Sequence, residues 1–106
     1  MKERFGTKIV LDEEKIKKEG KYNIEELCKE IDEMAEEAGL IKKDKLLYMC
    51  KGDDKDLAAI YLFNYEYLLE EEWFTKYISE WVGIDNKEGD SDLIMLCKEY
   101  ELGTWV

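Results

Sequence analysis

Residues 23–40 of this chain read NIEELCKEIDEMAEEAGL, and this stretch carries the clearest structural signal in the sequence. Its apolar residues recur every three or four positions from Ile24 to Ala38, which is the spacing of one face of an α-helix. Asn23 is a favoured N-cap, and Gly39 is typical of the left-handed position that ends a helix. We therefore predict an amphipathic helix over residues 24–38 that buries Leu27 and Ile31.

The opposite face of this predicted helix is strongly acidic. Between residues 23 and 39 one lysine accompanies seven carboxylates, and several of these lie three or four residues apart, where like charges destabilise a helix slightly. Such a face is either simply solvated or placed to meet a cation-rich partner. Its candidate partner-binding residues are Glu30, Glu33 and Glu37.

Short apolar runs flank this helix on both sides. Thr7–Leu11 favours a β-strand, and Asp12 after it can cap a brief helix that runs through Lys18 and ends at Gly20. Leu46–Cys50 is the second run. The two runs predict at most a small two-stranded antiparallel ribbon, although buried helix is equally compatible with segments this short.

The region after residue 52 is predicted to be helical. Leu57–Leu69 is almost entirely apolar or aromatic, so we place this helix at the centre of the core, with a β-strand over Ile60–Tyr67 as the alternative. Glu72–Val82 forms the next helix and ends at Gly83. A loop over residues 84–89 follows, and Ser91 caps a last helix from residue 92 to about residue 100.

Together these patterns predict a mainly α fold. One domain spans residues 1–106, with four to five helices and at most a short two-stranded antiparallel ribbon. The longest uncharged apolar stretch, Leu57–Tyr65, is too short to cross a bilayer. The first residues lack the apolar run of a signal peptide, and an odd number of cysteines suits a reducing compartment, so we expect a cytoplasmic protein.

Aromatic side chains are the strongest signal besides charge. The predicted Glu72–Val82 helix places Trp73, Tyr77 and Trp81 along one stripe, which is either part of the core or an anchor for an interface. Thirteen aromatic residues are many for one small core, so some of them, such as Tyr61, Tyr65 or Trp105, are candidates for the surface. The candidate partner-binding residues in this region are Glu70, Glu71, Trp73, Tyr77 and Trp81.

The sequence lacks the patterns of most catalytic and metal sites. Histidine is absent, which removes the commonest general base and metal ligand, and the three cysteines form no close pair. No phosphate-binding glycine motif occurs. The two acidic clusters, at residues 53–56 and 85–92, lack the spacing of a calcium loop and are better explained as helix caps. We predict no catalytic residue, no cofactor and no metal.

The net charge of −11 limits the partners. A protein this acidic repels nucleic acids and anionic membranes and attracts basic surfaces. We therefore expect a small non-enzymatic binding module that docks a basic protein surface. In its sharper form this is a nucleic-acid mimic, in which carboxylates on helices stand in for phosphates, as in small anti-restriction or anti-CRISPR proteins of phages. The alternative is a homo-oligomeric structural or regulatory protein assembled through its aromatic helices.

Overall fold

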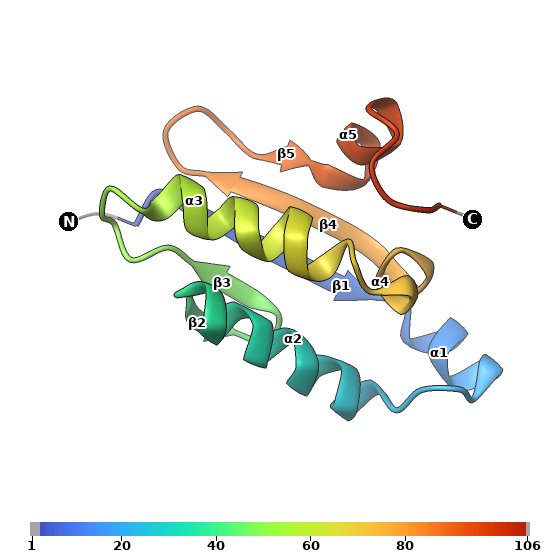
Figure 1. The fold of residues 1–106 in the computed structure, drawn as a ribbon. Coiled ribbons are helices and arrows are strands. Elements are labelled where there is room, and N and C mark those ends of the chain that lie inside the picture. The colour runs from blue at the N-terminus through green and yellow to red at the C-terminus, as the bar shows by residue number, and fades with distance from the viewer. Residues whose placement is uncertain (1–2, 106) are drawn as a thin grey trace.

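The computed structural model describes residues 3–105, which form an antiparallel sheet with helices packed on it (Figure 1). The strands are β1 (Phe5–Leu11), β2 (Ile41–Asp44), β3 (Leu47–Met49), β4 (Ile78–Asp85) and β5 (Ser91–Asp92). The helices are α1 (Glu13–Glu19), α2 (Ile24–Ala38), α3 (Asp56–Tyr61), α4 (Glu72–Tyr77) and α5 (Leu93–Glu99), and a π-helical segment η1 (Leu62–Leu68) continues α3 directly.

The five strands lie in the order β2-β3-β1-β4-β5, and each is antiparallel to its neighbours. The prediction of a mainly α fold is therefore wrong, because the chain is mixed α/β with 47% helix and 23% strand. The two short apolar runs do pair in antiparallel fashion, with Thr7 opposite Tyr48 and Lys8 opposite Leu47. They form the middle of a larger sheet, however, and not an isolated ribbon.

The largest error concerns the segment predicted as the helix Glu72–Val82. Helix α4 ends at Tyr77 and the chain continues as strand β4, so Gly83 lies inside a strand and does not end a helix. Strand β4 pairs with β1 along nearly its whole length, from Asp85 opposite Phe5 onwards. Pairing between segments about 70 residues apart overrides the local four-residue spacing that suggested a helix.

Side chains along β1 point alternately to the two faces of the sheet. Thr7, Ile9 and Leu11 are buried on one face, which we call the inner face, whereas Lys8 is exposed on the other, which we call the open face. Helices α2 and α3 with η1 both lie over the inner face (Figure 1). They bury a common core with it, whose largest side chains are Tyr48, Phe63, Phe74, Tyr77 and Trp81.

Helix α2 has the predicted bounds and the predicted ends. The side chain of Asn23 accepts hydrogen bonds from the N–H groups of Glu25 and Glu26. Gly39 follows the helix with φ of 91°, a left-handed conformation that glycine adopts without strain. Leu27 and Ile31 are 1% and 0% exposed, which confirms the predicted core face.

The predicted central helix is also confirmed, with one feature that the sequence did not indicate. It extends over α3 and η1, and its second half is wound as a π-helix, a rare geometry in folded proteins. The β-strand alternative for this region is therefore wrong. Asn64 interrupts the apolar run and is only 3% exposed, and it contacts the sheet through Thr7.

Among the smaller elements, those in the N-terminal part of the chain end as predicted, whereas those after residue 83 differ from the prediction. Helix α1 is capped by Asp12 and ends at Gly20, as predicted. The last helix, α5, is capped by Asp92 and not by Ser91, which lies in β5. Residues 84 and 85 belong to β4 and not to a loop. Within residues 3–105, no helix has both the length and the apolar character needed to cross a bilayer.

Candidate functional site

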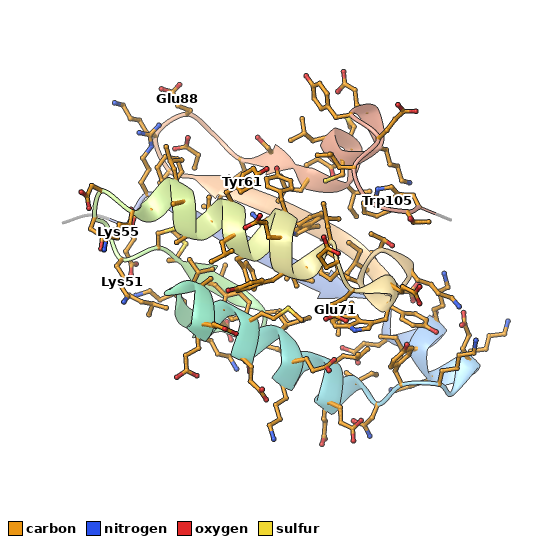
Figure 2. The ribbon with its side chains drawn as sticks, in the orientation of Figure 1. Lys51, Lys55, Tyr61, Glu71, Glu88 and Trp105 are labelled. Carbon is orange, nitrogen blue, oxygen red and sulfur yellow. The ribbon has the colours of Figure 1, made fainter. Side chains whose placement is uncertain are left out.

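Exposed carboxylates of α2 and a half-buried carboxylate of the turn before α4 face the same region of the surface. Glu26, Glu30 and Glu33 lie on successive turns of α2, and Glu71 approaches them from the turn that follows η1 (Figure 2). Partial burial, together with the charges of Glu71, Glu33 and Glu26, raises the pKa of Glu30. These four residues define the acidic surface, which two segments distant in the sequence build together.

Lysines do not neutralise this acidic surface. Within residues 3–105, ion pairs connect five cations with Glu3, Glu13, Glu19, Asp32 and Asp85. The acidic surface and the candidate carboxylates beside it comprise six residues: Glu26, Glu30, Glu33, Glu37, Glu70 and Glu71. None of these six takes part in an ion pair within residues 3–105. In the described part of the chain, no cation is therefore ion-paired with these carboxylates.

Not every carboxylate of α2 belongs to this surface. Asp32 lies on the side of α2 that faces the sheet, where its two carboxylate oxygens accept hydrogen bonds from Tyr48 and from Lys42. This contact ties the helix to strands β2 and β3. Asp32 therefore has a structural role that the charge count of the helix does not reveal.

The remaining predicted carboxylates lie at the margins. Glu37 is exposed one helical turn beyond Glu33, toward the end of α2 that Lys51 and Lys55 approach (Figure 2). Glu70 is exposed beside Glu71 and lines two neighbouring grooves. The structure thus brings Glu30 and Glu33 together with Glu71, and it places Glu37 and Glu70 at the two edges of this group.

The aromatic candidates lie in the core. Trp73, Tyr77 and Trp81 are 6%, 1% and 0% exposed, and the ring of Trp81 packs edge-on against Phe74 with centroids 4.9 Å apart. The Tyr77 hydroxyl donates a hydrogen bond of 2.8 Å to Glu19. These three side chains are therefore part of the core of the folded chain and are not exposed on its surface.

A groove of about 440 Å³ adjoins the acidic surface at Glu70. Tyr61 lies at its rim, 58% exposed, and points away from the sheet toward the side of α5 (Figure 2). Tyr65 and Leu102 form further parts of the wall, and Leu102 is 41% exposed. The aromatic count predicted surface tyrosines, but only the fold shows that the C-terminal tail completes a groove with them.

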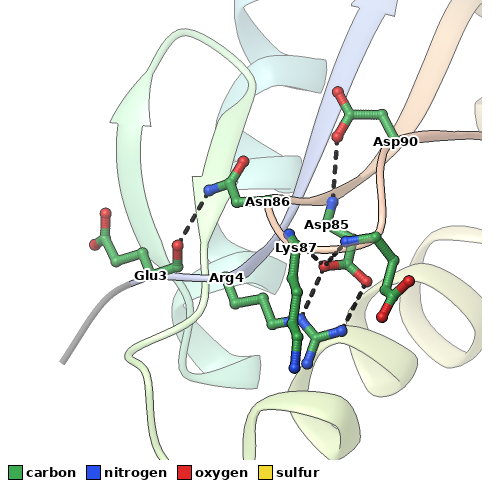
Figure 3. A network of polar contacts seen from close by, with 7 residues as sticks. Glu3, Arg4, Asp85, Asn86, Lys87 and Asp90 are labelled. Carbon is green, nitrogen blue, oxygen red and sulfur yellow. Dashed lines mark hydrogen bonds and ion pairs between the residues drawn. The ribbon is translucent and has the colours of Figure 1, made fainter.

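A second cluster of charges has a structural function (Figure 3). Arg4 donates two hydrogen bonds, of 2.8 and 3.2 Å, to the carboxylate of Asp85, which also accepts from the N–H groups of Lys87 and Glu88. The guanidinium of Arg4 is the main cause that lowers the pKa of Asp85 to about 2. This network joins the start of β1 to the end of β4 and organises the turn after it.

The acidic cluster at residues 53–56 likewise makes backbone contacts. One carboxylate oxygen of Asp56 accepts hydrogen bonds from the N–H groups of Gly52 and Asp53, and Asp53 accepts one from Lys55. These contacts organise the turn that leads into α3. In the described part of the chain, no three acidic or cysteine side chains are placed to hold a metal ion together.

Comparison with known proteins does not assign the chain to a family. No protein-family model matches the sequence, and a search of curated proteins finds no match.

Proposed function

We propose that this protein is a non-enzymatic binding module whose acidic surface docks a basic protein surface in the cytoplasm. The observation that carries the proposal is the convergence of Glu30 and Glu33 of α2 with Glu71 of a distant turn, without a lysine paired to any of them. Gathering like charges from two segments costs stability, since exposed carboxylates repel one another within roughly 10 Å. A basic partner would remove this repulsion on binding.

The neighbouring groove adds a second kind of contact. Tyr61 and Leu102 expose apolar surface directly beside Glu70, so a partner can pair its basic side chains with the carboxylates and place an apolar side chain in the groove. Charge at the margin of an interface mainly accelerates association, whereas a buried apolar contact slows dissociation. The two features together fit specific docking better than solubility alone does.

Nucleic-acid mimicry is the narrower form of this proposal. The carboxylates of Glu26, Glu30, Glu33 and Glu37 follow one another at about 4.5–6 Å along the axis of α2, given the rise of 1.5 Å per residue. Phosphates of one DNA strand follow one another at about 3.4 Å of axis, so α2 alone carries a lower charge density than a nucleic-acid strand. Mimicry would therefore need the contribution of Glu71 and its neighbours as well.

The proposal is tested by reversing the charge of the surface. We expect the triple variant Glu30→Lys, Glu33→Lys, Glu37→Lys to fold normally and to lose the basic proteins that the wild type captures from a lysate at low salt. A control variant carries the same reversals at exposed residues outside this surface: Glu88→Lys, Glu99→Lys and Glu101→Lys. Added DNA that displaces the captured proteins would support mimicry. Equal capture by wild type and triple variant, with the same salt dependence, would contradict the proposal.

A further inference from the structure

Two grooves adjoin where the C-terminal tail, residues 102–105, passes the end of η1. Their volumes are about 440 Å³ and about 380 Å³, and Leu69 and Glu70 line both of them. The tail borders both grooves as well, at Gly103 in the first and at Thr104 in the second. We call the two together the tail groove. Because they share residues on both sides, a single bound segment can extend from one groove into the other.

The tail is held in place as a wall of this groove. The hydroxyl of Thr75 donates a hydrogen bond of 2.6 Å to the backbone carbonyl of Thr104. Gly103 passes so close to Leu69 that a Cβ on this glycine would lie 3.0 Å from the Leu69 Cδ2 atom. The groove is therefore formed in the free protein, and a preformed site costs less ordering entropy on binding than one that must first assemble.

The first of the two grooves has apolar walls. The rings of Tyr61 and Tyr65 lie 5.1 Å apart at its helical side, and Leu102 of the tail adds an aliphatic side chain. Tyr61 and Leu102 are both exposed, so water contacts this apolar surface in the free protein. A bulky aliphatic or aromatic side chain of a partner would displace that water and bury the apolar surface, which is the main source of affinity in most interfaces.

The second groove is acidic. Three consecutive carboxylates line it, those of Glu70, Glu71 and Glu72, and none of them takes part in an ion pair within residues 3–105. Lys76 also lines this groove, but its ammonium group is paired with Glu19 at 3.0 Å. Glu71 belongs to the acidic surface as well, so carboxylates continue from the groove onto α2. The second groove therefore suits a lysine or arginine side chain.

From the adjacency of an apolar and an acidic groove we propose that the tail groove binds a short extended peptide segment in which a bulky apolar residue adjoins lysine or arginine residues. This inference rests on the proposed docking of a basic partner and specifies which part of that partner is recognised. An extended segment advances about 3.3 Å per residue, so neighbouring side chains of one segment reach both grooves. Further basic residues of the segment would then lie over Glu71 and Glu30.

Fluorescence anisotropy with the full chain and labelled synthetic peptides tests this inference. Each complete probe contains one leucine and two arginines in a background of glycine and serine, and the set places the leucine before or after the arginines. Comparison probes replace either the leucine or both arginines by serine. We expect a complete probe to bind at least about tenfold more tightly than its comparison probes, because only the complete probe fills both grooves with side chains that suit them.

Matched variants locate the binding. Leu102→Ser should weaken binding of the complete probe about tenfold, whereas Leu57→Ser, at an exposed position of α3 outside the groove, should leave it unchanged. Tyr61→Ser tests the same apolar wall from the helical side. Glu70→Lys should also weaken binding, most strongly at low salt, whereas Glu88→Lys at the far end of the molecule should have little effect (Figure 2). Circular dichroism verifies that each variant folds.

Three results would overturn the inference. They are no binding of any complete probe, equal binding by wild type and the groove variants Leu102→Ser, Tyr61→Ser and Glu70→Lys, and equal affinity for the probe without arginines, which would indicate an apolar ligand instead.

The charge-reversed α2 variant separates this inference from the proposed function. Its substitutions at Glu30, Glu33 and Glu37 leave the tail groove intact, so it should still prefer the complete probe to the comparison probes. Loss of the captured basic proteins in this variant, with no probe bound by the wild type, would contradict the peptide groove alone. Unchanged capture together with specific binding of the complete probe would contradict the docking role of the α2 carboxylates alone.

Discussion

The hydroxyl of Thr7 donates a hydrogen bond of 3.1 Å to the side-chain oxygen of Asn64, and both residues are buried. Thr7 lies in the central strand β1 and Asn64 lies in the π-helical segment η1, so this bond joins the sheet to the helix across the core. A buried polar pair of this kind fixes the position of a helix that apolar packing alone would leave free to slide.

Breaking this pair should destabilise the fold. We expect Thr7→Val to lower the free energy of unfolding by about 1–3 kcal/mol, since the Asn64 amide then remains buried without its partner. The double variant Thr7→Val, Asn64→Leu should cost less than the sum of the single variants, because neither polar group is then left behind. Urea unfolding of the three variants measures both effects. Strict additivity would show that the bond contributes no coupling.

The core face of α2 can be tested at its most buried position. Ile31 is 0% exposed, so Ile31→Ala should lower the free energy of unfolding by about 2–5 kcal/mol through lost burial and the cavity left behind. Lys29→Ala on the exposed side of the same helix should change it by less than about 0.5 kcal/mol. An unchanged denaturation midpoint for Ile31→Ala would contradict the assignment of this face.

The Arg4–Asp85 pair makes stability depend on pH in the acidic range. The folded pKa of Asp85 is lowered to about 2 from its ordinary value of 3.8, so its ionised form stabilises the fold above pH 4, and this contribution is lost as the pH falls toward 2. Wild type should therefore be more stable than Asp85→Asn at neutral pH, and the difference should shrink at low pH. In an Arg4→Gln background most of this pH dependence should disappear. A difference that stays constant from pH 7 to pH 2 would contradict the assignment.

The three cysteines should differ in reactivity. Cys28 is half-buried, whereas Cys50 and Cys97 are buried, and desolvation raises the pKa of Cys50 to about 12. Because the thiolate is the reactive form, we expect an alkylating reagent to modify Cys28 of the native protein first. After unfolding without a reductant, all three thiols should react, as measured by mass spectrometry. A mass two hydrogens lower, with a single alkylation, would reveal a disulfide and contradict a reducing compartment.

Helices with complete local signals could be predicted from the sequence. Helix α2 combines a periodic apolar face, an N-cap at Asn23 and a left-handed glycine at its end, and its bounds agree with the prediction. Helix α1 has the same kind of ends, with a cap at Asp12 and a left-handed glycine at position 20, whereas the helix of α3 and η1 lacks a side-chain cap and was indicated by its apolar run. In α1 and α2, the determining contacts are between residues at most four apart, which the sequence displays directly.

The candidate surface was predicted only in part. Glu30 and Glu33 could be proposed from the charge of one helix, but their approach to Glu71 depends on how η1 packs against α2. Likewise, the periodicity of the stripe containing Trp73 and Trp81 is equally compatible with a surface and with a core. Trp81 is 0% exposed because it lies in strand β4 on the inner face of the sheet, and Trp73, 6% exposed, belongs to the core on that same face.

The sequence by itself determined which segments of this protein are helical at residues 13–19, 24–38 and 56–68, and that its surface is acidic. Tertiary structure alone decided that residues 78–85 form a strand, because β4 acquires its hydrogen bonds from β1, about 70 residues earlier in the chain. A helix satisfies its backbone groups within four residues, whereas a strand depends on a partner whose position only the complete fold specifies.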